Sequence, residues 1–193
     1  MGHAGTLDPM ATGVLLVCCG KATKQVPSLM DFRKVYEGCI ELGTTTDTDD
    51  AEGNIVEQKS VPHLSLKSIQ EIVTQFRGEI QQVPPMYSAL KMNGQRLYKL
   101  ARQGKVVERS PRSVTVHELE ILHWEVPFLT IRVTCSKGTY IRALARDIGE
   151  VLKTGGYLKS LRRLRVGPYS VDDAIALSEL EENLILDESI QIH

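Results

Sequence analysis

A carboxylate in a constrained loop is the first feature of this chain that could do chemistry. Asp8 lies between Gly5 and Gly13 and is followed by Pro9, which disfavours helical backbone at Asp8 and favours an extended conformation. The apolar run 14–19 predicts a buried strand that would hold this loop rigidly. An acid on a stiff loop beside a core element is a common way to present a catalytic carboxylate. On this segment alone, a turn aspartate bonded to its own backbone is the alternative.

Five further stretches accompany this loop along the chain. In order, they are Arg33-Lys34-Val35-Tyr36, Gly43-Thr44-Thr45-Thr46-Asp47-Thr48-Asp49, Pro84-Pro85-Met86-Tyr87-Ser88-Ala89-Leu90-Lys91, Cys135-Ser136-Lys137-Gly138-Thr139-Tyr140-Ile141-Arg142 and Tyr157-Leu158-Lys159-Ser160-Leu161-Arg162-Arg163-Leu164. Together with residues 2–13 they resemble, in the same order, the motifs of the tRNA pseudouridine synthase B (TruB) family. The match extends from near Met1 to about Tyr169, and ordered matches over most of a chain are more specific than one short motif.

The resemblance implies isomerisation of uridine 55 in the T loop of tRNA to pseudouridine. This reaction breaks a glycosidic C–N bond, turns the uracil over and joins it again through carbon, so no cofactor and no metal are expected. Asp8 is expected to be the essential carboxylate, ionised at neutral pH, and Arg142 to pair with it so that burial does not neutralise the acid. Attack of Asp8 on C1′, attack on the uracil ring and removal of a sugar proton remain open.

A flipped-out base needs contacts that replace its lost stacking, each worth about 1 to 3 kcal/mol on an aromatic ring. The resemblance assigns Tyr36 to a position against the base, with a role in proton transfer, and Tyr140 to substrate contact; core packing is the alternative for either tyrosine taken alone. The spacing of Tyr140 and Arg142 predicts a strand-like segment that points both side chains into one pocket. The further substrate contacts implied by the resemblance are Leu161 for the target nucleotide and His3 for the flipped-out RNA. Lys24, in the run Gly20-Lys21-Ala22-Thr23-Lys24, is a candidate for phosphate contact.

A net charge of −1 conceals an uneven distribution of charge. Residues 88–112 carry seven Lys or Arg against one acid, and residues 137–165 carry eight against two, while acids gather at 47–57 and 172–188. Such segregation predicts a basic face for a phosphate backbone, and solvated helix faces are the alternative for either stretch alone. The segment 84–112 also resembles the family's mobile insertion that grips the T stem and loop, and its part 95–103 suits a lid that orders on RNA.

The length of 193 residues and the hydrophobic content of 42% predict a domain with a sizeable core. The expected elements are a strand at 33–42 with its hairpin partner at 54–61, a helix at 65–77 between a Ser65 cap and Gly78, strands at 112–125 and 128–135, and a helix at 139–153. They predict an α+β fold built on a mixed, largely antiparallel sheet with flanking helices, which the resemblance identifies as the pseudouridine synthase fold. Residues 1–169 would form the catalytic domain, with its insertion at about 84–112, and residues 170–193 a short acidic C-terminal segment.

Several classes of protein are disfavoured by what the sequence lacks. No stretch approaches the roughly 18 to 20 apolar residues of a membrane span, and the amino terminus lacks a secretory pattern, so the expected compartment is the cytoplasm. The four cysteines form no Cys-x-x-Cys pair and predict buried free thiols. The acidic run 47–53 has the wrong spacing for a calcium loop, so no metal site is expected, and the chain is expected to act on tRNA as a monomer.

Two departures from the family accompany these matches. Full-length members open with a strand and a helix carrying a Lys-Pro-x-Gly motif, and many bacterial members end in a PUA-type RNA-binding domain. We therefore expect either a fragment or a misassigned start, with an exposed sheet edge where the upstream strand is lost. The alternative function is a non-catalytic tRNA-binding or tRNA-folding module inactivated by truncation. A hydrolase using Asp8 as a nucleophile is a third reading, for which no second carboxylate is placed.

Overall fold

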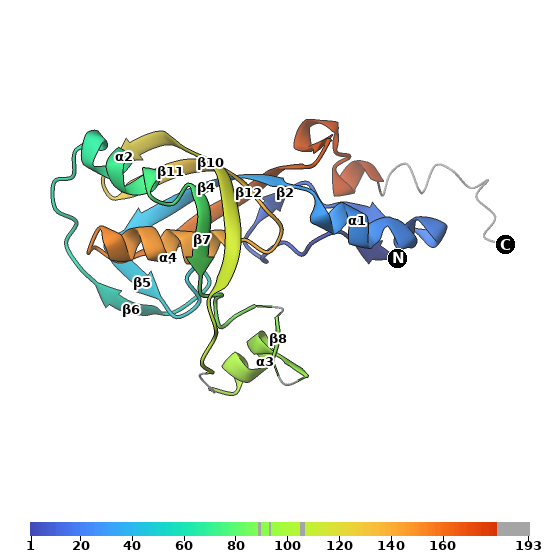
Figure 1. Ribbon diagram of the computed structural model, residues 1–193, viewed down its shortest axis with the longest axis horizontal. Helices are drawn as coiled ribbons and strands as arrows, with labels where there is room; N and C mark the ends of the chain where they lie inside the picture. The colour runs from blue at the N-terminus through green and yellow to red at the C-terminus, as the bar shows by residue number, and fades with distance from the viewer. Residues whose placement is uncertain (89, 93, 105–106, 181–193) are drawn as a thin grey trace.

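The computed structural model describes residues 1–180, apart from 89, 93, 105 and 106. Its main element is a seven-stranded sheet (Figure 1). Six strands follow one another across it in the order β13 (Tyr169–Ser170), β12 (Gly156–Val166), β4 (Lys34–Leu42), β11 (Phe128–Cys135), β10 (Arg112–Glu125) and β7 (Gly78–Gln82). These neighbours are antiparallel, whereas the seventh strand, β2 (Thr12–Gly13), pairs in parallel with β12. The predicted mixed, largely antiparallel α+β fold is confirmed.

Smaller elements surround this sheet. Three two-stranded sheets pair β1 (Gly2–His3) with β3 (Val17–Cys18), β5 (Thr44–Thr46) with β6 (Ile55–Gln58), and β8 (Lys91–Met92) with β9 (Gln95–Arg96). The helices are α1 (Val26–Asp31), α2 (Leu66–Thr74), α3 (Leu97–Arg102) and α4 (Ile141–Val151), with the 3-10 helices η1 (Gly20–Gln25) and η2 (Val171–Asp173). In Figure 1, β8 and α3 project below the sheet, and the region of α1 extends to its right. Within the described residues, no helix is long and apolar enough to cross a membrane.

The core lies between one face of the sheet and helices α2 and α4, which also touch each other. Along β4, Ile40 and Leu42 are buried on this face, and alternate residues point to the other face. Helix α4 presents an apolar stripe that includes the fully buried Leu144 and Ile148. This packing fixes the position of α4, whose amino-terminal end lies beside the loop that carries Asp8.

Most of the predicted elements are confirmed. The strands at 112–125 and 128–135 have the predicted bounds, and the strand at 33–42 is β4. The helix at 65–77 is the shorter α2, capped by Ser65, whose Oγ accepts a hydrogen bond from the Ser68 amide at 3.1 Å. The pairing predicted for 54–61 is wrong, because β11 and β12 flank β4 on both sides and β6 pairs instead with β5.

The apolar run 14–19 is not one buried strand, as the sequence predicted. Its start follows β2 on the main sheet, where the Val14 amide donates to the Arg163 carbonyl, and its end is β3 in a separate sheet. Leu15 between them is exposed. Cys19, beyond the end of β3, is also exposed, so the prediction of four buried thiols is wrong for this residue and for the half-buried Cys39.

Candidate active site

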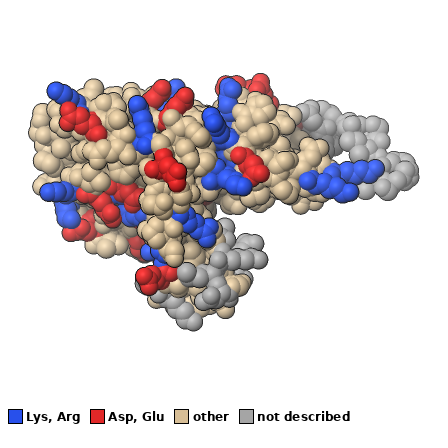
Figure 2. All heavy atoms as spheres, in the orientation of Figure 1, with Lys and Arg blue, Asp and Glu red and all other residues tan. Residues whose placement is uncertain are grey.

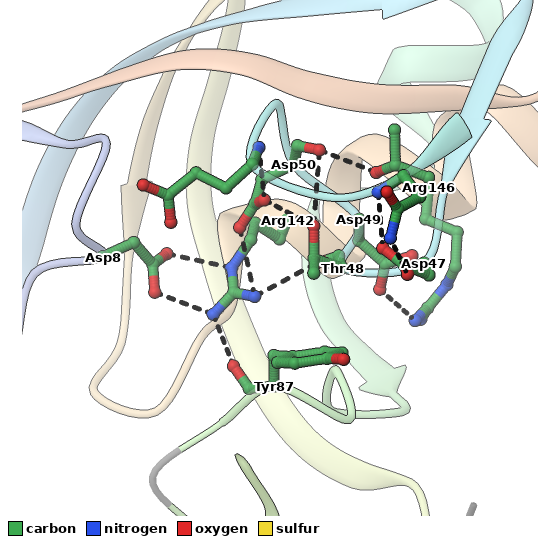
Figure 3. Close-up of polar contacts among 11 residues, drawn as sticks. Asp8, Asp47, Thr48, Asp49, Asp50, Tyr87, Arg142 and Arg146 are labelled. Atoms are coloured by element: carbon green, nitrogen blue, oxygen red, sulfur yellow. Dashed lines mark hydrogen bonds and ion pairs between the residues drawn. The ribbon is translucent and has the colours of Figure 1, made fainter. Parts of the chain in front are cut away.

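Asp8 and Arg142 form a two-pronged ion pair, although 134 residues separate them in the chain (Figure 3). Arg142 Nε donates to Asp8 Oδ2 at 3.0 Å, and Arg142 Nη2 donates to Asp8 Oδ1 at 2.7 Å. The Arg142 side chain is 5% exposed and that of Asp8 is 28% exposed. A paired guanidinium and carboxylate of this geometry have a defined mutual orientation.

The remaining donors of Arg142 fix it to two other segments of the chain. Nη1 donates to the Thr48 carbonyl at 3.0 Å and lies 3.3 Å from Asp50 Oδ2, while Nη2 also donates to the Tyr87 carbonyl at 2.9 Å. The Asp50 side chain is 4% exposed and accepts a hydrogen bond from the Thr48 hydroxyl at 2.5 Å. Arg142 is therefore held by a buried second carboxylate, which sequence reasoning missed because Asp50 lies just outside the matched motif 43–49 and was counted only among the clustered acids and in the rejected calcium loop.

The loop that carries Asp8 is fastened to β12 at both of its ends. Gly13 has φ +104, and a Cβ there would lie 2.1 Å from the Arg163 carbonyl oxygen, so the close approach of β2 to β12 requires glycine. Arg163, which is 1% exposed, donates from Nε to the Val14 carbonyl at 2.8 Å and from Nη2 to the Gly5 carbonyl at 3.2 Å. Arg163 thus holds the loop in place, a role that the sequence did not reveal.

A cavity of about 290 Å³ opens beside this ion pair. Five of the seven predicted site residues line it: Asp8, Tyr36, Tyr140, Arg142 and Leu161. Tyr36 comes from β4, Leu161 from β12, and Tyr140 from the residue that precedes α4. The structure therefore brings the predicted acid, its arginine, both phenols and the apolar side chain to one place.

Two predicted site residues lie outside the cavity, and one structural argument is corrected. His3 on β1 and Lys24 on η1 are exposed and are not part of its lining. Tyr140 and Arg142 line the cavity, but not from a strand: α4 begins at Ile141, so Arg142 lies in its first turn. Gln82, which is 1% exposed, fixes the backbone at Tyr140 by accepting from its amide at 2.8 Å and donating to its carbonyl at 3.0 Å.

Burial governs the protonation of the two phenols. Burial raises the pKa of Tyr36, although the neighbouring Arg163 guanidinium acts in the opposite direction. Burial also raises the pKa of Tyr140. Both hydroxyl groups are therefore protonated at neutral pH and are able to donate hydrogen bonds or a proton. Among the described residues, no group of three or more His, Cys, Asp or Glu side chains is arranged to hold a metal ion.

The surface carries fewer free cations than the basic stretches predict. Arg142, Arg146 and Arg163 belong to the stretch 137–165, yet all three guanidinium groups bond inward to carboxylates or backbone carbonyls. Basic and acidic side chains are interspersed on the face that Figure 2 shows. The predicted basic face of residues 88–112 falls largely outside the described part of the chain. The side chains that lie outside it are those of Lys91, Arg96, Lys99 and Arg102, together with residue 105.

Comparisons with known proteins identify the family of this chain. The model of the TruB family pseudouridylate synthase (N terminal domain) matches residues 1–141, and that of the tRNA pseudouridylate synthase B C-terminal domain matches residues 142–191. The tRNA pseudouridine synthase B of Chromohalobacter salexigens is 54% identical over 181 residues, which are 94% of this chain and 59% of that protein. The protein of the same name from Francisella philomiragia is 51% identical over 182 residues, or 94% of this chain and 60% of that protein.

The fold is also that of a solved relative. A chain in the crystal structure of a Cbf5-Nop10-Gar1 complex matches with a TM-score of 0.74 and 30% identity, over 100% of this chain and 48% of that chain. This chain spans about 60% of the length of the curated relatives it matches. The family model covers most of the chain, and the relatives share half of its residues. The chain belongs to the TruB family of pseudouridylate synthases.

Proposed function

We propose that this chain isomerises uridine 55 in the T loop of tRNA to pseudouridine. The observation that carries the proposal is the Asp8–Arg142 pair on the wall of a cavity that two tyrosines and Leu161 also line. The comparisons support the proposal because relatives that are about 50% identical to this chain are named tRNA pseudouridine synthase B.

The reaction balances without a cofactor. The bond from C1′ to N1 breaks, a bond from C1′ to C5 forms, the proton on C5 is lost and N1 gains a proton. Asp8 acts as the carboxylate at the reacting centre, and the two hydrogen bonds from Arg142 keep it oriented. The cavity wall formed by Tyr36, Tyr140 and Leu161 excludes water from the separated sugar and base, which prevents hydrolysis.

In this proposal the insertion and two exposed side chains bind the RNA. Residues 1–169 form the catalytic domain, and residues 170–193 form a short acidic segment after it. Within the catalytic domain, residues 84–112 grip the T stem and loop. His3 and Lys24, both exposed outside the cavity, contact the RNA around the target nucleotide. The chain acts in the cytoplasm, as a monomer on one tRNA.

Tritium release from a T stem-loop RNA labelled at C5 of uridine tests the proposal. We expect the unsubstituted chain to release tritium and Asp8→Asn to release none, while RNA affinity stays within a few-fold, because the amide keeps the shape but not the charge. Asp173→Asn, on the exposed η2, is the matched control and should keep full activity. Binding of the RNA by the unsubstituted chain without tritium release would leave only a non-catalytic tRNA-binding module.

A further inference from the structure

A second arginine on α4 repeats the arrangement around Arg142, one helical turn further along (Figure 3). Arg146 Nη1 donates to Asp49 Oδ2 at 2.9 Å, and its Nε and Nη2 donate to Asp147 Oδ1 at 2.9 and 2.8 Å. Nη2 also donates to the Val83 carbonyl at 3.0 Å. Each of the two arginines thus joins a carboxylate of the loop 47–50 to a backbone carbonyl near the predicted insertion. Arg146 binds the carbonyl just before the insertion, and Arg142 binds one within it.

These arginines fasten the root of the insertion, which we define as residues 83–87. Arg146 binds the carbonyl of Val83, and Arg142 binds that of Tyr87. From the returning side of the insertion, Arg109 Nη1 donates to the Pro84 carbonyl at 3.0 Å. The root is therefore attached to α4 at two points, and the Tyr87 carbonyl shares Arg142 Nη2 with the Asp8 carboxylate.

The Asp49–Arg146 pair is largely buried but does not touch the reacting centre. The two side chains are 17% and 19% exposed, and neither lines the cavity. Asp49 adopts the left-handed conformation with φ +62, which is uncommon for residues other than glycine. Burial also raises the pKa of Asp49 and of Asp147, although Arg146 opposes this shift. The fold thus retains a strained backbone and two desolvated carboxylates to hold Arg146.

We propose that Asp49 and Arg146 are positioning residues for the isomerisation: they fix the root of the insertion so that the Tyr87 carbonyl stays on Arg142 and Arg142 stays on Asp8. This inference rests on the proposed function. Movement of the root would remove one acceptor of the guanidinium that orients Asp8. Because displacements of about 1 Å at a reacting group lower rates by up to roughly 100-fold, a loosened root slows the chemical step.

Asp49→Asn is the most direct test, because it removes the charge that anchors Arg146 Nη1 and so loosens the guanidinium that binds the Val83 carbonyl, while Asp147 keeps the arginine side chain partnered. We expect the single-turnover rate of tritium release to fall about tenfold and the affinity for the T stem-loop RNA to stay within threefold. Asp49→Glu restores the charge and should recover part of the rate. Glu57→Gln, which breaks the exposed Lys59–Glu57 ion pair, is the matched control and should leave the rate unchanged.

Other outcomes would overturn the inference. An unchanged rate in Asp49→Asn, or a weaker affinity with an unchanged rate, would show that the pair does not position the reacting groups. Hydrogen exchange of the amides at 82–88 gives a second readout, which should become faster in Asp49→Asn and in a less stable Arg146→Gln, but not in Glu57→Gln. If the unsubstituted chain releases no tritium, the proposed function fails, and unaltered exchange at 82–88 would then refute the positioning role separately.

Discussion

Replacing Arg142 by glutamine should destabilise the fold as well as abolish the reaction. The substitution leaves the Asp50 carboxylate, 4% exposed, and the Asp8 carboxylate, 28% exposed, without their counter-charge. Removing one partner of a buried ion pair costs about 3–5 kcal/mol, because the other charge stays desolvated. For a domain of this size, each kcal/mol lowers the melting temperature by about 2–4 °C, so the melting temperature should fall by roughly 6–20 °C.

A double-mutant cycle identifies the origin of this loss. Asp50→Asn in the Arg142→Gln background removes the stranded buried charge, so the double variant should be more stable than Arg142→Gln alone while remaining inactive. Urea unfolding followed by circular dichroism measures all four proteins, and Arg132→Gln, which breaks the exposed pair with Glu37, should cost at most about 1 kcal/mol. If Arg142→Gln lowered the free energy of unfolding by less than about 1 kcal/mol, the reasoning would be refuted. A double variant with a lower free energy of unfolding than either single variant would refute it as well.

Three further predictions follow from local features of the structure. Gly13→Ala should melt several degrees lower than the unsubstituted chain, because its Cβ would lie 2.1 Å from a carbonyl oxygen of β12. Gln82→Leu should lower the unfolding free energy by about 1–3 kcal/mol in urea titrations, since it leaves the Tyr140 amide without its acceptor, whereas the Tyr140 carbonyl still accepts from the Leu144 amide at 3.1 Å. Burial raises the pKa of Cys135 to about 11, so mass mapping at pH 8 should find iodoacetamide on the exposed Cys19 and not on Cys135. Because this raised pKa favours the thiol in the folded state, the stability it contributes is present below pH 9 and is lost between pH 9 and 11.

Each of these has its own control. Gly78→Ala is the control for Gly13→Ala, because Gly78 also has a positive φ, +88, but open space around the new Cβ. The loss of stability in Gly78→Ala therefore measures backbone strain alone, and any further loss in Gly13→Ala comes from the steric clash with β12. Gln82→Met also lacks the polar atoms but keeps an unbranched side chain, so it should lose about as much stability as Gln82→Leu if the missing hydrogen bond sets the cost. Alkylation of Cys135 at pH 8 in the folded protein would contradict its burial.

Five of the residues that line the cavity could be predicted from the sequence, whereas the residues that hold them in place, including Arg163 on the cavity wall, could not. Asp8, Tyr36 and Arg142 belong to ordered motifs whose residue types already indicate chemistry. Asp50 and Arg163 act through contacts to Arg142 and to the loop 5–14, which depend on the folded path of the chain. The sequence contained one signal for Asp50 and Arg163: both are charged residues within stretches that form a buried turn or a strand.

The errors in secondary structure share one physical cause. The apolar run 14–19 has the composition of a strand, but composition does not say that its two ends join different sheets. The strand at 54–61 was assigned to its neighbour in sequence, whereas β4 pairs with β11 and β12. In both cases long-range pairing decided the outcome, and local propensity carries no information about it.

The position of β4 in the sheet has a consequence for synthesis on the ribosome. This strand pairs with β11 and β12, whose partner residues lie roughly 90–130 residues further along the chain. Because such distant contacts close slowly, the nascent polypeptide must keep β4 unpaired until β11 has emerged from the exit tunnel at about residue 135, and one edge of β4 stays open until about residue 166. The cavity wall that contains Tyr36 of β4 and Leu161 of β12 is therefore complete only after β12 has emerged, and the segment 34–42 is the stretch on which chaperones would act.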